Sequence, residues 1–421
     1  MVDADQTFVI VGGGLTGAKA AETLREEGFT GRVILVCDER DHPYERPPLS
    51  KGFLLGKAER DSVFVHEPGW YAAHDVELHL GQTVAAIDRA ARTVHYGDDG
   101  TRLRYDKLLL ATGAEPRRLD VPGTDLAGVH HLRRLAHAER LKGVLASLGR
   151  DNGHLVIAGA GWIGLEIAAA AREYGAEVTV VEPSPTPLHG VLGPELGAVF
   201  AELHAAHGVR FQFGVSLTEI IGQDGMVLAA RTDDGEEHPA HDVLAAIGAA
   251  PRTSLAQAAG LEIAPAEHGG GIVVDERLRT SDPDIFAAGD VASFPHALLG
   301  TRLRVEHWAN ALNGGPAAAR AMLGREEAYD RVPYFFSDQY DLGMEYSGWA
   351  PPGAYDQVVI RGDAAKREFI AFWLSEGRVL AGMNVNVWDV TDQIQRLIRS
   401  GTPVDAHALA DPHVPLENLV G

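Results

Sequence analysis

The chain has 421 residues, of which 45% are hydrophobic, so it is long enough for two or three domains that each bury a core. Its formal net charge of -22 argues against general binding to nucleic acid or to an anionic membrane, because both require a positive field over a large face. A single cysteine, Cys37, excludes an intrachain disulfide and a cysteine-built metal cluster. With no signal-peptide pattern and no apolar run of membrane-spanning length, we expect a cytoplasmic protein.

The first element in chain order is a buried strand predicted over residues 8–11, followed by a glycine turn and a helix start. An alanine-rich stretch then leads to a second apolar strand at residues 33–36, which together predict a βαβ unit of a parallel sheet. In such a unit the glycines allow a tight turn, close approach of backbone to a pyrophosphate, and close packing of helix on sheet. These positions are Gly12, Gly14 and Gly17. Asp38 or Glu39 is expected to bond the adenine ribose, and Asp38 is preferred because it ends the apolar run.

A proline-rich loop follows, Pro43-Tyr44-Glu45-Arg46-Pro47-Pro48-Leu49-Ser50-Lys51. Prolines fix an extended backbone, so the loop presents Arg46 and Lys51 rigidly. A surface loop with solvated cations is the simpler interpretation. Its place directly after a dinucleotide-binding unit favours a cover over the cofactor, with Arg46 near the diphosphate and Lys51 near the redox ring.

A second copy of the pattern runs from an apolar strand at residues 155–158 to another at residues 178–181. Its turn contains Gly159, Gly161 and Gly164. Glu182 follows the second strand directly, and residues 183–187 contain no Lys or Arg. A 2′-phosphate would meet a carboxylate and no cation there, so the sequence predicts NADH rather than NADPH as the ligand.

The order of these elements predicts a discontinuous first domain. The runs at residues 107–113 and 285–290 both look like strands that end at a ligand, and the second glycine unit lies between them. We therefore expect an α/β protein with two Rossmann-like dinucleotide-binding domains and a C-terminal α+β domain with short aromatic strands. The expected boundaries are 1–114 with 248–326 for the first domain, 115–247 for the second and 327–421 for the third.

Other chemistries lack their signals in this sequence. The 19 histidines show no metal-binding spacing, so no metal site is expected. No G-x-S-x-G segment stands between a strand and a helix, which argues against a serine hydrolase.

Several segments together resemble the flavin-dependent ferredoxin reductases of bacterial oxygenase systems over essentially the whole chain. They are PYERPPLSK, ATGAEPR, GAGWIGLE, TSDPDIFAAGD, VEHWANA, PYFFSDQYDLGMEYSG and NVWDVTDQIQRLIRSG. The resemblance implies a glutathione-reductase-like fold, with FAD in the first domain and NADH in the second. Two places depart from the family: Cys37 stands where glycine is common, and residues 187–190 lack a common arginine.

The site residues expected from these patterns and from the resemblance fall into two groups. Those expected at FAD are Gly12, Gly14, Gly17, Asp38, Glu39, Arg46, Lys51, Thr112, Gly113, Arg117, Gly289, Asp290 and Trp308. Those expected at NADH are Gly159, Gly161, Ile163, Gly164, Glu166, Glu182 and Gly248. Lys51 and Glu166 are expected to form a catalytic pair beside flavin N5, and Trp308 to lie by the flavin on the acceptor side.

The implied activity is that of a ferredoxin–NAD(+) reductase, in which a hydride passes from NADH to FAD N5. Electrons then leave singly to a [2Fe-2S] or other ferredoxin that serves a P450 or Rieske-type oxygenase. Cys37 has no partner cysteine, so a disulfide relay is excluded. Alternatives are an NADH oxidase or quinone reductase, and a redox-sensing interaction protein like apoptosis-inducing factor.

An acidic ferredoxin would be repelled at long range by a chain of charge -22, so docking should depend on local arginines. Arg302 and Arg304 alternate on a predicted strand that leads to Trp308, and they are the preferred candidates. Ordinary solvated charge on an alternating strand is the competing interpretation.

Overall fold

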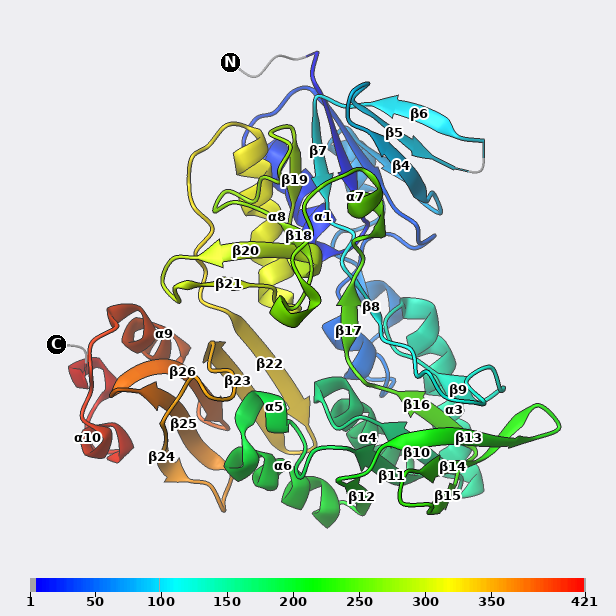
Figure 1. Ribbon diagram of the computed structural model, residues 1–421, viewed down its shortest axis with the longest axis vertical. Coiled ribbons are helices and arrows are strands. Elements are labelled where there is room, and N and C mark those ends of the chain that lie inside the picture. The colour runs from blue at the N-terminus through cyan, green and yellow to red at the C-terminus, as the bar shows by residue number, and fades with distance from the viewer. Residues whose placement is uncertain (1–4, 98, 420–421) are drawn as a thin grey trace. The chain divides into compact units, whose positions relative to one another are not determined.

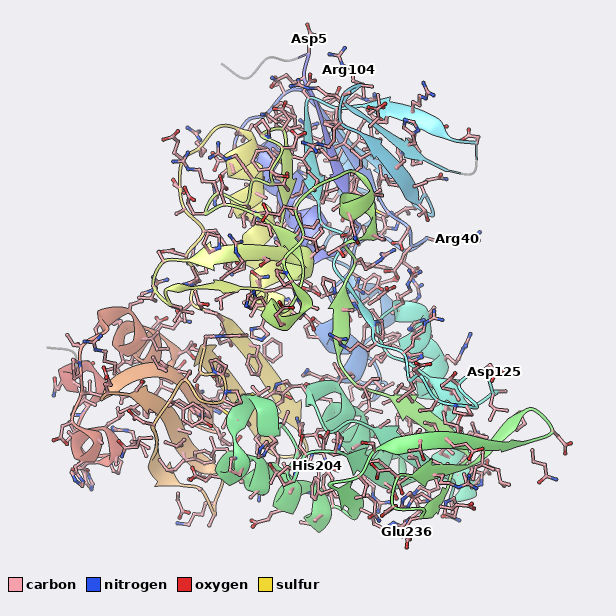
Figure 2. The ribbon with its side chains drawn as sticks, in the orientation of Figure 1. Asp5, Arg40, Arg104, Asp125, His204 and Glu236 are labelled. Carbon is pink, nitrogen blue, oxygen red and sulfur yellow. The ribbon has the colours of Figure 1, made fainter. Side chains whose placement is uncertain are left out.

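The computed structural model describes residues 5–97 and 99–419. Most of its larger elements are labelled in Figure 1, and Figure 2 adds the side chains. The chain forms two compact units. The first contains the described residues of Met1–Glu45, Arg60–Glu115 and Ala250–Pro333, and the second those of Arg46–Glu59, Pro116–Ala249 and Tyr334–Gly421. The short strands β8 (Ala114–Pro116) and β17 (Ala249–Pro251) lie where the chain passes from one unit to the other.

A parallel sheet of five strands in the order β19-β7-β1-β2-β3 forms the centre of the first unit (Figure 1). Its strands are β1 (Thr7–Val11), β2 (Arg32–Val36), β3 (Val76–His79), β7 (Lys107–Leu110) and β19 (Ile285–Ala287). The inner strands are continuous runs of Val, Ile and Leu with almost no exposure, as expected for a sheet that is covered on both faces. Because β1 pairs with both β2 and β7, the strand order reverses beside β1.

Two helices of the first unit, α1 (Leu15–Glu26) and α8 (Trp308–Met322), pack with their backbones close together. A Cβ atom at Gly315 would overlap the carbonyl oxygen of Thr16, so only glycine permits this approach. The helix α8 comes from the last segment of the unit and α1 from the first, so their packing joins distant parts of the sequence.

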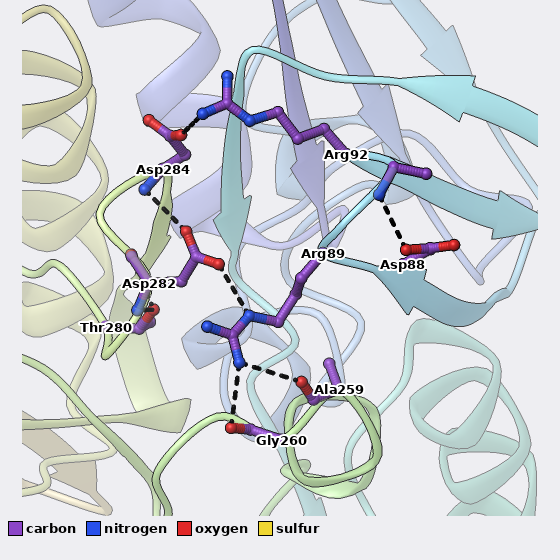
Figure 3. Close-up of polar contacts among 9 residues, drawn as sticks. Asp88, Arg89, Arg92, Ala259, Gly260, Thr280, Asp282 and Asp284 are labelled. Atoms are coloured by element: carbon purple, nitrogen blue, oxygen red, sulfur yellow. Dashed lines mark hydrogen bonds and ion pairs between the residues drawn. The ribbon is translucent and has the colours of Figure 1, made fainter.

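Arginine–aspartate pairs fasten the edge strand β19 to the rest of the first unit (Figure 3). Arg89 donates from Nε to Asp282 (2.8 Å), and Arg92 pairs with Asp284, which Lys107 also contacts at 2.6 Å. Both aspartates lie in the turn just before β19, whereas both arginines lie in the hairpin between β4 (Val84–Asp88) and β5 (Thr93–Tyr96). The conspicuous TSDPD segment therefore fixes the last strand of the sheet.

Smaller elements complete the first unit. The antiparallel sheet β4-β5-β6 includes β6 (Thr101–Arg104), and a second small sheet joins β18 (Ile272–Val273), β20 (Ala292–His296) and β21 (Thr301–Leu303). Short helices are α2 (Trp70–Ala73), α7 (Ser254–Ala258), η2 (Arg60–Val63), η3 (Ala266–His268) and η4 (Gly289–Val291).

The second unit repeats the first arrangement with the parallel sheet β12-β11-β10-β16-β9. Its strands are β9 (Val129–His130), β10 (His154–Ala158), β11 (Glu177–Glu182), β12 (Val209–Phe213) and β16 (Asp242–Ala245). Its helices are α3 (Leu135–Asp151), α4 (Trp162–Tyr174), α5 (His189–Leu192) and α6 (Pro194–Ala206), and a small antiparallel sheet holds β13 (Leu217–Gln223), β14 (Met226–Thr232) and β15 (Glu237–Pro239). The strand order reverses beside β10, as it does beside β1.

The C-terminal part of the chain forms an antiparallel sheet in the order β22-β23-β26-β25-β24. The strands are β22 (Tyr334–Gln339), β23 (Leu342–Gly348), β24 (Gln357–Asp363), β25 (Glu368–Ser375) and β26 (Arg378–Val385), followed by α9 (Thr391–Ser400), α10 (Ala406–Ala410) and η5 (Leu416–Leu419). One hydrophobic core contains Ile157 of β10, Phe200 of α6 and Trp373 of β25. The C-terminal sheet therefore packs on the second parallel sheet through a continuous apolar interior.

A short segment, residues 46–59, leaves the first unit and joins the second. It begins with η1 (Pro47–Ser50), and its Leu54 is fully buried in the same core as Ile157 and Trp373. Tyr174 of α4 donates its hydroxyl to the Leu54 carbonyl oxygen (2.9 Å). This anchoring brings the proline-rich loop onto α4.

The helical segments of the described chain include none that is both long and apolar enough to cross a membrane.

Replacing Gly164 by alanine should destabilise the protein by about 1–3 kcal/mol, because the added Cβ would overlap the Gly159 carbonyl oxygen and separate α4 from its sheet. Urea unfolding followed by circular dichroism measures the change. The matched control is Gly143→Ala in the exposed part of α3, where a Cβ meets nothing within 4 Å. That variant should gain about 0.5–1 kcal/mol. Equal effects of the two substitutions would contradict the packing argument.

Candidate functional site

The carboxyl ends of β1, β7 and β19 meet at one edge of the first sheet and form a cradle of glycine backbone. Gly12, with φ of +123°, has no room for a Cβ because that atom would overlap the Ala111 carbonyl oxygen at the end of β7. Gly14 begins α1 in extended conformation and no side chain caps this helix start, so the first N–H groups are open to an anion. A backbone cradle and an uncapped helix start fit a dinucleotide pyrophosphate.

Four other predicted FAD residues of the first unit lie just beyond β7 and β19. Gly289 and Asp290 follow β19, and Asp290 is buried. Thr112 donates its hydroxyl to the Arg252 carbonyl oxygen (2.9 Å), and Gly113 accepts the Arg252 N–H (2.9 Å).

The two carboxylates after β2 have different neighbours. Asp38 pairs with the Arg252 guanidinium at 3.1 Å, whereas Glu39 accepts the Tyr44 hydroxyl at 2.7 Å. Cys37 precedes them with 1% exposure, and burial together with both carboxylates raises the pKa of its thiol to about 12. Its side chain fills the space beside Gly13. This thiol is therefore a packing residue and not a nucleophile.

Trp308 and its neighbours occupy the start of α8 in the first unit. The Trp308 indole Nε1–H donates to Glu45 Oε2 at 3.0 Å, which fixes the orientation of the ring. Burial lowers the pKa of His307 to about 4, so its imidazole is neutral at neutral pH.

The second sheet carries an equivalent cradle. Gly159 has φ of +101°, and a Cβ there would lie 2.5 Å from the Ala246 carbonyl oxygen at the end of β16. Gly161 begins α4 without a side-chain cap, and a Cβ at this glycine would meet nothing within 4 Å, which leaves room for a ligand against the backbone. Ile163 follows with 41% exposure, and Gly248 accepts the Arg117 N–H at 2.9 Å beyond β16.

Glu182 ends β11 and reaches back to the second glycine turn. Its Oε2 accepts the Ala160 N–H at 2.8 Å, and its Oε1 accepts the Ser184 N–H at 2.9 Å. Each carboxylate oxygen has two acceptor sites, so both oxygens can still accept a ribose hydroxyl. The carboxylate therefore holds the turn and stays available to a ligand.

Lys51 and Glu166 form the ion pair expected between them, with Nζ 2.7 Å from Oε1. Glu166 lies in the first turns of α4 with 4% exposure, and Ser50 and Ser337 also donate their hydroxyls to its carboxylate. The Lys51 ammonium lies 5.4 Å from the centre of the Phe336 ring, within range of a cation–π attraction. The pair is therefore largely desolvated and well defined in geometry.

The serines at Glu166 were not identified from the sequence, because a lone serine in a loop or strand carries no chemical pattern. The only available signal was their place inside the conspicuous segments PYERPPLSK and PYFFSDQYD. Arg46, which was identified, donates from Nη1 to the Arg133 carbonyl oxygen at 2.8 Å.

Arg302 and Arg304 lie at β21, where the alternation predicted a strand, but their guanidinium groups bind the backbone of the first unit. Arg302 donates to the carbonyl oxygens of Val274 (3.0 Å) and Ser293 (2.5 Å). Arg304 donates to the carbonyl oxygens of Gly269 (2.5 Å) and Asp290 (3.2 Å), and pairs with Glu306 at 2.6 Å. Both side chains thus have structural contacts.

Comparisons with known proteins agree with this architecture. Residues 6–315 match the family model "Pyridine nucleotide-disulphide oxidoreductase", and residues 334–420 match the model "Reductase C-terminal". The chain is 39% identical to the ferredoxin–NAD(+) reductase component of the anthranilate 1,2-dioxygenase system of Burkholderia cepacia, over 98% of this chain and 99% of the relative. It is 36% identical to putidaredoxin reductase of Pseudomonas putida, over 100% and 98%. The crystal structure of a covalent putidaredoxin reductase–putidaredoxin complex matches with a TM-score of 0.93 and 35% identity, over 99% of each chain.

Proposed function

The chain belongs to the pyridine nucleotide-disulphide oxidoreductase family, and we propose that it carries electrons from NADH to a ferredoxin of an oxygenase system. It is an FAD-dependent oxidoreductase that uses NAD(H). When bound, FAD accepts a hydride from NADH and releases the electrons one at a time. Similarity along the full length of reductases that serve ferredoxins, the C-terminal domain included, supports the proposed acceptor.

The single buried cysteine carries the argument that the acceptor is external. A redox-active disulfide within the chain requires two cysteines, and this chain has one. Cys37 is also inaccessible and its raised pKa keeps it protonated. Electrons therefore leave without passing through a protein thiol. The one cysteine is also compatible with the reducing cytoplasm that we propose as the location.

The two glycine cradles have distinct proposed roles. The first, around Gly12 and Gly14, holds the FAD pyrophosphate at the start of α1, and Asp38 or Glu39 receives the adenine ribose. Thr112, Gly113, Arg117, Gly289 and Asp290 line the rest of FAD, with Arg46 at the diphosphate. The second, at Gly159, Gly161, Ile163, Gly164 and Gly248, holds NADH, whose ribose hydroxyls bond Glu182.

Lys51 and Glu166 are the proposed catalytic pair. The Lys51 ammonium supplies positive charge where the reduced flavin becomes negative, and Glu166 fixes the position of that ammonium through their 2.7 Å contact. Trp308, held by Glu45, is proposed to lie on the side from which electrons leave. The protein's contribution is placement and electrostatics, because the redox chemistry belongs to the cofactors.

The direct test is NADH-driven reduction of a panel of purified ferredoxins, with cytochrome c reduction as the readout. We expect turnover with at least one ferredoxin and a clear preference for NADH over NADPH. Glu182→Ala should narrow that preference, because the carboxylate that repels a 2′-phosphate is lost. Turnover with oxygen or quinones alone would identify an oxidase or quinone reductase. Slow turnover with every acceptor would identify a redox sensor.

Lys51→Ala should slow flavin reduction by NADH by about 10- to 1,000-fold while FAD stays bound, since the charge that stabilises reduced flavin is removed. Stopped-flow absorbance of the flavin band measures the rate. The control is Lys57→Ala, because Lys57 lies in the same segment and forms an exposed ion pair with Glu173 at 2.6 Å. In Lys57→Ala the flavin should be reduced by NADH at the normal rate. If the flavin of Lys51→Ala is also reduced at the normal rate, Lys51 has no part in flavin reduction and its pair with Glu166 is structural.

The finer proposal that Arg302 and Arg304 dock the ferredoxin requires a test that separates charge from structure. Any substitution removes the guanidinium contacts with the backbone, so the double substitutions to Lys and to Met are compared, because both lose these contacts and only Lys keeps the charge. For a docking role, Met should raise the KM for ferredoxin several-fold at low salt, Lys should preserve it, and ferricyanide reduction should stay intact.

The chain offers a matched control for this experiment, because Thr-Arg-Leu-Arg occurs a second time at residues 101–104 in β6. The double substitution Arg102→Met and Arg104→Met should leave the KM for ferredoxin unchanged. An unchanged KM in the Arg302 and Arg304 Met variant as well would place the docking surface elsewhere.

A further inference from the structure

A line of buried polar side chains in the second unit leads from Glu166 to His204, a residue outside the proposed ligand sites. Ser337 Oγ donates to Glu166 Oε1 at 2.7 Å, Gln339 Nε2 donates to Ser337 Oγ at 3.0 Å, and His204 Nε2 lies 2.8 Å from Gln339 Oε1. None of the four side chains is exposed by more than 4%. Ser337 and Gln339 project from one face of β22, and His204, labelled in Figure 2, projects from α6.

The direction of each hydrogen bond follows from the chemistry of the groups. A carboxylate only accepts, so at Glu166 the Ser337 hydroxyl must donate. The Ser337 hydroxyl has one hydrogen, and that hydrogen is donated to Glu166. At its other contact Ser337 can therefore only accept, so the Gln339 amide nitrogen must be the donor there. The Gln339 oxygen then faces His204, so the imidazole carries its proton on Nε2.

The state of His204 agrees with this direction. Burial lowers its pKa to about 4, so the ring is neutral at neutral pH and has one N–H. Its Nδ1 has no hydrogen-bond partner among the described residues. A bare acceptor is tolerated better than a bare buried donor, which also favours the proton on Nε2.

We propose that His204, Gln339 and Ser337 form a directional hydrogen-bond relay that holds the Glu166 carboxylate in place beside Lys51. The three are positioning residues, and they rest on the proposed catalytic role of the Lys51–Glu166 pair. Burying three polar side chains in an apolar core is costly unless each is bonded, and here every bond points toward one carboxylate. Side chains of the C-terminal sheet thereby position the Glu166 carboxylate of α4.

The relay predicts which tautomer the His204 imidazole adopts. Without Ser337 the Gln339 amide loses the hydrogen bond that sets its orientation, and the preference of His204 for Nε2–H is weakened. The tautomer is read from ring ¹⁵N shifts and couplings in histidine-labelled holoenzyme, with His204 assigned by comparison with a His204→Phe spectrum. We expect Nε2–H in the wild-type protein and a measurably larger Nδ1–H population in Ser337→Ala, which does not alter His204 itself.

The same variant should slow flavin reduction by NADH by about 10-fold in stopped flow, because Glu166 loses one charge-assisted hydrogen bond. Ser347→Ala is the matched control, since Ser347 is a buried serine of the neighbouring strand β23 whose hydroxyl contacts Gln395. It should change neither the tautomer nor the rate. Glu166→Gln is a second variant, and it keeps the shape of the side chain at position 166. It should also raise the Nδ1–H population of His204, because an amide can donate to Ser337 and so reverse the direction of that hydrogen bond.

An Nδ1–H tautomer of His204 in the wild-type protein would overturn the relay. It would also be overturned if Ser337→Ala had both the His204 tautomer and the flavin-reduction rate of the wild-type protein. The tautomer is measured without NADH or ferredoxin. A wild-type protein that reduces no ferredoxin would therefore overturn the proposed function while leaving the hydrogen-bond relay to be judged by its own spectrum.

Discussion

The close approach of backbone to backbone at two glycine turns is the constraint on which the rest of the structure depends. At Gly12 and Gly159 the chain leaves a central strand and passes so near to the carbonyl oxygen of the neighbouring strand that no side chain fits. Each turn sets the start of the next helix, α1 or α4, directly over the edge of its sheet. The uncapped N–H groups and the helix dipole then point at the same place in both units. Any larger residue would move the helix and its uncapped N–H groups together.

The second glycine helix also carries the proposed catalytic carboxylate, and this explains which segments make up the second unit. Glu166 follows the turn within α4, and a buried carboxylate there is unfavourable without partners. Its partners come from two other parts of the chain, the proline-rich segment with Ser50 and Lys51 and the strand β22 with Ser337. This requirement accounts for the excursion of residues 46–59 out of the first unit, since their burial beside α4 keeps the ammonium in place.

Features encoded by a local pattern could be predicted, and features that depend on distant contacts could not. The strands and glycine turns of both βαβ units have a period and a spacing that are visible in any short window. The contact of Lys51 with Glu166 followed from family resemblance, because the two lie 115 residues apart. Ser337, Gln339 and His204 show no period or motif that links them. Alternation placed Arg302 and Arg304 on a strand, but no sequence pattern indicates that the carbonyl oxygens of Val274, Ser293 and Gly269 would bind them.

The division of the first unit into three segments affects how the protein is made. Its sheet lacks the edge strand β19 until residue 287 has left the ribosome, and Asp290 and α8 come later still. The parallel sheet of the second unit ends with β16 at Ala245, so it can form first. The nascent first segment then has its glycine turn but neither β19 nor the helix that packs on α1. A ribosome stalled before residue 285 therefore carries a first unit that lacks both its edge strand and α8.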